Sequence, residues 1–328
     1  MTGQQESGQQ VMFRPRRLGH ANLFVSDLER SMQFYHKVCG LEEVFREPAI
    51  HAGFLSNGNT HHDVAVVQVT ETSLLGRDSQ ALLPEGWGKR AGLFHLGFEM
   101  ENEAELVAAY RRARQAGVKV LMTVDHQLAR SVYLFDPEGN LLEFYADTTK
   151  DWRGVFRAHE NQLVTGLWNL GEPAPSAERN YPVDPDIRRV ADAVLHPRRM
   201  AHAALAVRDL EVSHDFYHEV AGLQEVVRTS EGPFAVLRGT CPGYDLTLVQ
   251  AGADRPVGLH HIGFEMSDEG ELNEAEVQLK RVGIEPESRL DHATKRSIFL
   301  KDPDGILLEC YIQRAPLNQE AAVQPYLA

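Results

Sequence analysis

The first residue in this sequence that suggests chemistry is Glu143. It follows a D-P-E-G turn at 136–139 and lies within L-L-E-F-Y (141–145), a segment that is typical of a buried β-strand. An unpaired carboxylate is costly to bury, so such a group becomes neutral, pairs with a cation or binds a metal. The rest of the chain must therefore supply a partner for Glu143.

Two histidines are candidates for that partner. His20 and His95 each open a predicted strand that runs into a predicted helix. With Glu143 they make a 2-His-1-carboxylate set, the ligand combination of non-haem Fe(II) sites with open coordination positions. A single histidine in a strand is more often a hydrogen-bonded core residue than a ligand. The three together are a stronger indication, because the carboxylate needs a cation and both histidines begin equivalent strands.

The sequence repeats itself, and the repeat places these residues in equivalent elements. The first copy begins H-A-N-L-F-V-S-D-L-E and the second H-A-A-L-A-V-R-D-L-E. H-L-G-F-E-M and D-P-E-G-N-L-L-E return in the same order as H-I-G-F-E-M and D-P-D-G-I-L-L-E. This pattern predicts a duplicated domain whose copies differ in loop length. The matching blocks are 20–44 with 202–226, 95–100 with 261–266, and 136–143 with 302–309.

Each copy is itself double. A strand opened by histidine runs into a helix, and further strands follow until the next such histidine. We therefore predict an α+β fold of four βαβββ modules paired into two similar domains. In the first strand, His20, Asn22 and Phe24 should share one face, because strand side chains alternate between faces.

The first two helices have predicted caps and apolar stripes. Ser26 with Glu29 has the spacing of a capping box for the first helix. Asn102 with Glu105 has the same spacing before the second. The stripes are Leu28, Met32, Tyr35 and Cys39 in the first helix, and Leu106, Ala109, Tyr110 and Ala113 in the second.

The repeats set the domain boundaries. They leave a linker at 148–199 between the two domains. A linker this long usually packs on the domains that it joins, so we expect it to cover the metal pocket as a lid or wall. Its Trp152, His159 and Trp168 are then candidates for the substrate pocket, and its helical signal lies only at 186–194. The predicted segments are an N-terminal tail (1–14), an N-terminal metal-binding domain (15–147), the linker (148–199), a C-terminal domain (200–315) and a C-terminal tail (316–328).

Composition excludes several classes of partner. With 328 residues the chain is long enough for two domains, and 43% apolar residues can fill both cores. A formal charge of −14 argues against nucleic acid and anionic membranes, because phosphate groups need a basic surface. We see no membrane span or signal peptide, and the three cysteines form no disulfide framework, so we expect a cytoplasmic protein.

These motifs together resemble the vicinal oxygen chelate superfamily, and within it the two-domain type I extradiol catechol dioxygenases. The resemblance covers roughly residues 15–315 and rests on the duplicated units, the strand-opening histidines and the D-P-x-G-x-x-x-E blocks. It implies Fe(II), with Mn(II) as an alternative, held by His20, His95 and Glu143. It also implies a small aromatic diol and O2 as substrates and ring opening next to the diol. We further expect a homo-oligomer.

The resemblance also assigns residues that would move protons. The family's acid/base histidine falls on His62, its substrate-side histidine on His126, and its tyrosine before the D-P-x-G turn on Tyr133. We expect His61 and His62 to point to opposite faces of an extended strand start, so that only one reaches the metal pocket.

The second copy keeps the ligands, and its His292 matches His126, but it lacks the acid/base histidine and the tyrosine. Its triad is His202, His261 and Glu309. Tyr244 stands where the first copy has the acid/base histidine, and Phe299 where it has the tyrosine. The N-terminal domain is therefore predicted to be the catalytic one, the reverse of the family's better-known bacterial members. The C-terminal triad is either a second metal site or a vestigial one.

Two alternatives stay open. A metal isomerase of the glyoxalase kind usually has a fourth protein ligand, often a carboxylate, and the corresponding strand at 63–69 has no inward glutamate. An aromatic-ligand-binding protein of the same fold needs no metal triad. The ligand set therefore favours the dioxygenase.

Overall fold

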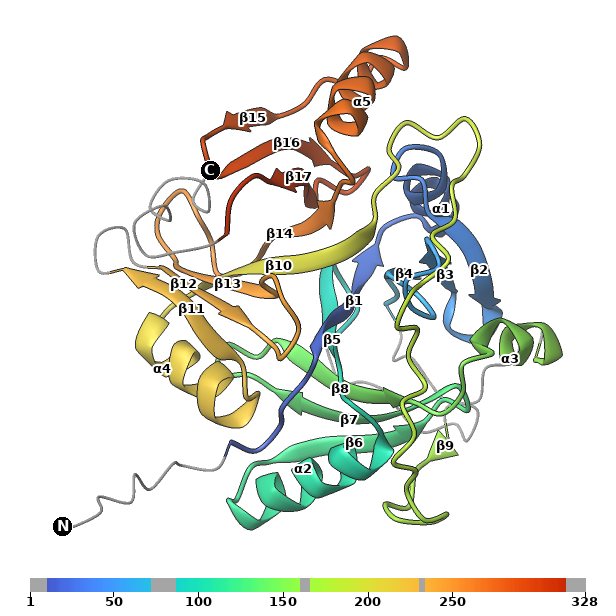
Figure 1. The fold of residues 1–328 in the computed structure, drawn as a ribbon, viewed down its shortest axis with the longest axis vertical. Helices are drawn as coiled ribbons and strands as arrows, with labels where there is room; N and C mark the ends of the chain where they lie inside the picture. The colour runs from blue at the N-terminus through green and yellow to red at the C-terminus, as the bar shows by residue number, and fades with distance from the viewer. Residues whose placement is uncertain (1–10, 72–86, 160–165, 230–233, 317–328) are drawn as a thin grey trace.

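Two mixed β-sheets with helices on their outer faces organise the chain (Figure 1). The computed structural model describes residues 11–71, 87–159, 166–229 and 234–316. The first part contains β1 (Arg17–Val25), α1 (Leu28–Lys37), β2 (Glu42–Glu47), η1 (Pro48–Ile50), β3 (Ala52–Ser56), β4 (Val64–Gln68), β5 (Gly92–Glu99), α2 (Glu103–Gln115), β6 (Val120–Asp125), β7 (Ala129–Phe135), β8 (Leu141–Asp147), α3 (Trp152–Ala158) and β9 (Gly166–Leu167). The second contains β10 (Arg199–Val207), α4 (Leu210–Asp215), η2 (Phe216–Val220), β11 (Gln224–Thr229), β12 (Phe234–Arg238), β13 (Leu246–Gln250), β14 (Gly258–Glu265), α5 (Glu269–Arg281), β15 (Ser288–Asp291), β16 (Lys295–Lys301) and β17 (Leu307–Gln313).

The strand orders of the two sheets are nearly identical. The first is β2-β3-β4-β1-β5-β8-β7-β6-β9 and the second is β11-β12-β13-β10-β14-β17-β16-β15. β1 and β5 pair antiparallel in the centre, and each pairs in parallel with the last strand of its own module. The predicted fold of four βαβββ modules in two similar domains is confirmed.

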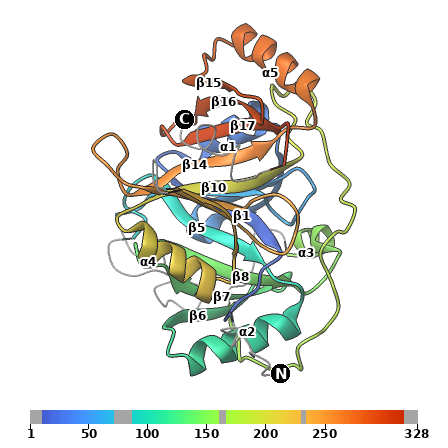
Figure 2. The same ribbon diagram turned by 60° about the vertical axis from the view of Figure 1, so that its left-hand side comes forward.

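The two domains are in close contact. Figure 2 shows β1 and β10 next to each other in the middle of the molecule. Tyr35 of α1 donates a hydrogen bond of 3.0 Å to Asp302, and Tyr217 of η2 donates one of 2.8 Å to Asp136. Each D-P-x-G turn is thus held by a buried tyrosine of the other domain. Apolar residues from both domains form one core on the side of the sheets that the helices cover.

The helix predictions hold in part. Asn102 caps α2 by accepting from the backbone N–H of Glu105, as predicted. The predicted cap of α1 is wrong by one residue, because Asp27 caps this helix and the backbone N–H of Ser26 donates to Asp304 of the other domain. Among the described helices, the longest have 13 residues, too short to cross a membrane.

The linker differs from its prediction. Its described helix is α3, and the predicted helix at 186–194 is wrong. The backbone N–H of Arg188 donates to Asn57, and that of Val194 donates to Lys37. Because these amides find partners on the N-terminal domain, the segment needs no helical hydrogen bonds of its own.

Candidate metal centre

His20, His95 and Glu143 converge on one point inside the N-terminal sheet. Strand register brings them together: His20 on β1 lies opposite Gly97 on β5, which lies opposite Glu143 on β8. His20 Nε2 is 2.9 Å and His95 Nε2 is 3.0 Å from the same carboxylate oxygen, Glu143 Oε2. The three ligand atoms lie within 4.8 Å of one another, and all three residues are buried. The predicted ligand set is therefore assembled.

Gly97 makes room for this arrangement. A Cβ atom at this position would lie 2.0 Å from His20 Nε2, and a Cβ at the equivalent Gly263 would lie 2.0 Å from the ring of His202. The glycine in each H-x-G-F-E block is thus required by the histidine of the neighbouring strand. The repeated glycine was visible in the sequence, but its partner across the strands was not.

The protonation of His20 and Glu143 suits a divalent metal. Burial lowers the pKa of His20 to about 4, although Glu143 opposes this. Burial acts to raise the pKa of Glu143, but His20 and His95 outweigh it and hold that pKa well below its usual range. His95 Nε2 lies 3.0 Å from Glu143 Oε2 without the geometry of a hydrogen bond, and it has no other hydrogen-bond partner among the described residues. Imidazole nitrogens with an ionised carboxylate are a donor set that fits Fe(II) or Mn(II).

Ser131 fixes the remaining oxygen of the carboxylate. Its hydroxyl donates to Glu143 Oε1, the oxygen that does not face the two imidazoles. A hydrogen bond of this kind orients a metal-binding carboxylate from behind. Ser131 was not among the predicted site residues, although S-V-Y at 131–133 returns as S-I-F at 297–299.

His62 lies beside the triad, where the resemblance placed the acid/base residue. Its ring centroid is 4.1 Å from that of His20, and its Nε2 is 3.0 Å from Asn22 Oδ1. Asn22 shares the inner face of β1 with His20, as predicted. With Oδ1 of Asn22 accepting, Nε2 carries the proton and Nδ1, which has no described partner, is the basic atom.

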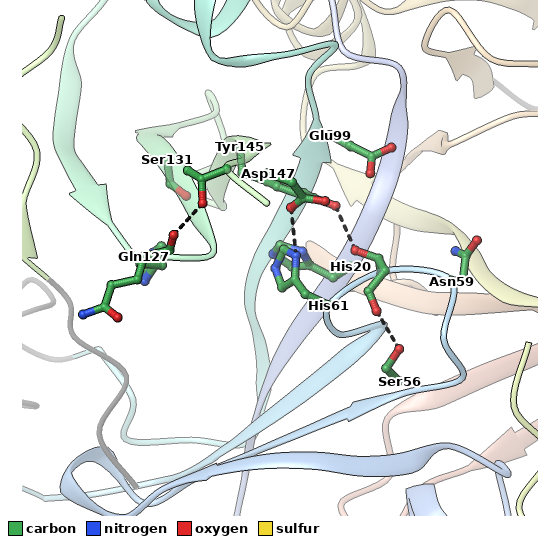
Figure 3. Close-up of polar contacts among 12 residues, drawn as sticks. His20, Ser56, Asn59, His61, Glu99, Gln127, Ser131, Tyr145 and Asp147 are labelled. Atoms are coloured by element: carbon green, nitrogen blue, oxygen red, sulfur yellow. Dashed lines mark hydrogen bonds and ion pairs between the residues drawn. The ribbon is translucent and has the colours of Figure 1, made fainter. Parts of the chain in front are cut away.

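His61 also lies in this cluster, so the expectation that only one of the two histidines reaches the pocket is wrong. Its ring centroid is 5.8 Å from that of His20, and its Nδ1 is 3.1 Å from Asp147 Oδ1 (Figure 3). The reason is the loop before β4. Asp63 accepts from Ser56 and from the backbone of Asn57, which folds this loop tightly and removes the strand alternation.

His126 and Tyr133 form the opposite side of the site. His126 Nε2 is 3.0 Å from the hydroxyl of Tyr133 and 4.0 Å from Glu143 Oε1. Burial, together with Glu143, raises the pKa of Tyr133 well above its ordinary value, so its hydroxyl stays a donor. The His126 side chain is 24% exposed, whereas those of the three ligands are at most 5% exposed. His126 is therefore closer to solvent than the three ligands are.

The linker residues separate into two groups. Trp152 and Phe156 of α3 pack with Phe45 and Tyr145, and the ring of Tyr145 is 4.9 Å from that of His20. A surface cavity of about 370 Å³ lies between α3 and β2, beside this aromatic cluster. Trp152 is thus separated from the ligand His20 by one aromatic ring, that of Tyr145.

Trp168 lies away from this cluster, and His159 is at the C-terminal end of α3. Trp168 packs on Arg130, whose side chain leaves β7 on the face opposite to Ser131, and belongs to the core shared with the helices. His159 caps α3, with its Nδ1 3.0 Å from the carbonyl oxygen of Val155. Trp168 therefore does not line the metal pocket, contrary to the expectation.

The C-terminal triad has a similar shape with a different environment. His202 Nε2 and His261 Nε2 are 3.0 and 3.4 Å from Glu309 Oε2. The ring of Tyr244 is 4.5 Å from that of His202, in the place of His62. Burial lowers the pKa of His202 to about 3. No proton-moving histidine replaces His62 here.

Comparison with known proteins identifies the family. The sequence profile of the Glyoxalase/Bleomycin resistance protein/Dioxygenase superfamily matches residues 17–144 and 199–310, one segment in each domain. Because these segments make up more than half of the chain, the protein belongs to this superfamily, the vicinal oxygen chelate superfamily. The predicted family is confirmed.

Particular relatives carry the comparison further. A catechol-2,3-dioxygenase of Bacillus subtilis (strain 168) is 27% identical over 250 residues, which span 75% of this chain and 73% of that protein. The solved structure of the 2,3-dioxygenase LapB from Pseudomonas sp. KL28 has a TM-score of 0.66 at 18% identity, covering 94% of this chain and 98% of that one. The Mn(II)-bound glyoxalase from Novosphingobium aromaticivorans has a TM-score of 0.65 at 15% identity, covering 94% and 85%. Both solved structures are thus similar in fold to this chain.

Proposed function

We propose that this protein is an extradiol dioxygenase that opens a catechol-type diol with O2 in its N-terminal domain, using Fe(II) held by His20, His95 and Glu143. The observation that carries the proposal is that this triad has an acid/base histidine and a tyrosine beside it, where the C-terminal triad has Tyr244 and Phe299. His62 lies on one side of the ligands, and His126 with Tyr133 on the other. The catechol-2,3-dioxygenase relative supports the same reaction class.

The metal and the protein have separate roles in this proposal. Bound Fe(II), or Mn(II), would supply Lewis acidity and adjacent open positions for the diol and O2. His62 takes the proton of a diol hydroxyl at Nδ1 and returns it as the ring opens, while Asn22 keeps its other nitrogen protonated. Tyr133 donates to a substrate oxygen, and His126 orients the tyrosine. Both atoms of O2 enter the ring-opened semialdehyde acid.

An oxygen assay tests the proposal. The protein is loaded anaerobically with Fe(II) and mixed with a series of catechols in an oxygen electrode, while the visible absorbance of the product is followed. We expect consumption of one O2 per catechol and a yellow product. Metal-loaded protein that consumes no O2 with any catechol, yet isomerises a thiohemiacetal, would contradict the dioxygenase and favour the glyoxalase alternative. Catechol binding without turnover would favour a binding protein.

A further inference from the structure

The C-terminal triad has a fourth residue beside it, a buried lysine, where the N-terminal triad has an alanine. Lys295 Nζ lies 2.7 Å from Glu309 Oε2 and 2.6 Å from Oε1. Oε2 is the oxygen that faces both His202 and His261. Lys295 is 1% exposed and Glu309 is 0% exposed. The carboxylate therefore already has a buried cation at the position where the two imidazoles converge.

Strand register shows which residue the lysine replaces. Ser131 on β7 pairs with Tyr145 on β8, and Ser297 on β16 pairs with Tyr311 on β17. Both serines donate to the triad glutamate. The residue two positions earlier on the same face is Ala129 in the first domain and Lys295 in the second. A methyl group in one copy thus corresponds to an ammonium in the other.

The surroundings of Lys295 are suited to an ammonium ion. Its Nζ lies 4.7 Å from the ring centroid of Tyr311 and 5.5 Å from that of Tyr244, within the range of cation–π contact. Tyr244 stands where the N-terminal domain has His62, so the same substitution that removes the acid/base residue supplies an aromatic face for the lysine. Tyr244 and Lys295 together therefore favour a buried ammonium over a metal at this triad.

We infer that the Lys295 ammonium takes the place of the metal cation in the C-terminal triad, so that, of the two triads among the described residues, only the N-terminal one holds a metal. A buried carboxylate needs one compensating cation, and Lys295 supplies it without a metal. A divalent ion on Glu309 would share its carboxylate with a fully buried like charge, which cannot move into solvent. The triad residues His202, His261 and Glu309 then persist as packing around an internal ion pair.

The test counts metal ions and does not use turnover. The apoprotein is dialysed against Mn(II), and bound Mn(II) per chain is measured by elemental analysis and by electron paramagnetic resonance. We expect one Mn(II) in the wild type and two in Lys295→Met, which removes the charge and keeps an unbranched side chain. The second ion should be lost again in Lys295→Met/His202→Ala. Circular dichroism checks that each variant is folded.

The reciprocal change keeps the test decisive if Lys295→Met fails to fold. Ala129→Lys places an ammonium in the equivalent position beside Glu143, and we expect it to lower bound Mn(II) from one to none. A wild type with two Mn(II), one of them lost in His202→Ala, would overturn this inference and leave the proposed function standing. A folded Lys295→Met that still binds one Mn(II) would overturn the role of the lysine. A wild type without Mn(II) would overturn the single-site assignment together with the metal centre of the proposed function.

Discussion

At the scale of single residues, the two domains differ in the groups that surround otherwise equivalent ligands. Glu143 Oε2 faces two imidazoles, and Glu309 Oε2 faces two imidazoles and an ammonium. His62 has Tyr244 as its counterpart, and Tyr133 has Phe299. Under the proposed function, each of these differences removes a proton-transfer group from the second copy or places a cation where a metal would bind. The residues of the two triads are identical, so the proposed difference in activity rests on the groups around them.

The first residue-scale prediction concerns proton transfer. His62→Gln should retain the metal and bind catechol but lose roughly 10²–10⁴-fold in kcat, the usual contribution of a positioned general acid/base. The matched control is His61→Gln, in which glutamine can still contact Asp147, and we expect a loss of under about tenfold. Stopped-flow turnover with parallel metal analysis separates the effects. A larger loss in His61→Gln than in His62→Gln would transfer the acid/base role to His61.

The second residue-scale prediction concerns Gly97. Gly97→Ala forces the His20 ring away, because the added Cβ would lie 2.0 Å from Nε2. We expect metal affinity to fall about 10–100-fold, the usual cost of disturbing the support of a ligand. Gly263→Ala makes the same steric change beside His202 and should leave metal affinity unchanged. Equal metal affinity in the two variants would show that His20 is not a ligand.

At the scale of elements, the strands were predictable and the loops were not. Alternation and the repeated blocks identified β1, β5 and β8, and strand pairing does the rest by placing His20, Gly97 and Glu143 in one row. The cap of α1 was mispredicted because Asp304, far away in the sequence, engages Ser26. The 186–194 segment was mispredicted because its amides bond to the N-terminal domain. Neither contact leaves a local sequence signal.

The element-scale prediction compares the two tryptophans of the linker. Trp152→Ala removes part of the wall that α3 builds against Tyr145, so KM for catechols should rise several-fold. Trp168→Ala creates a cavity beside Arg130 on the other face of the sheet and should lower unfolding stability by about 3–5 kcal/mol without a change in KM. Denaturant unfolding and steady-state kinetics on both variants give the comparison. A KM change in Trp168→Ala alone would return this residue to the substrate pocket.

At the scale of the whole molecule, the duplication explains both what was predictable and what was not. The matched blocks revealed four modules and two triads, and the missing histidine and tyrosine in the second copy pointed to the N-terminal domain. Lys295 is also visible in the second copy of the repeat, at the position that Ala129 has in the first. Its significance required the structure, because a lysine in a strand is ordinarily exposed, whereas this one is 1% exposed. The joint core and the reciprocal tyrosine–aspartate hydrogen bonds hold the two unequal halves together.

The most direct measurement compares the two strand-opening histidines in the same assay. His20→Ala and His202→Ala make equivalent changes in equivalent places, so folding effects should match. After anaerobic loading with Fe(II), we predict that His20→Ala retains no metal and consumes no O2 with catechol, because a three-ligand site fails when one ligand is removed. His202→Ala should keep the metal content and O2 consumption of the wild type. Loss of O2 consumption in His202→Ala with full activity in His20→Ala would contradict a ring-opening site in the N-terminal domain.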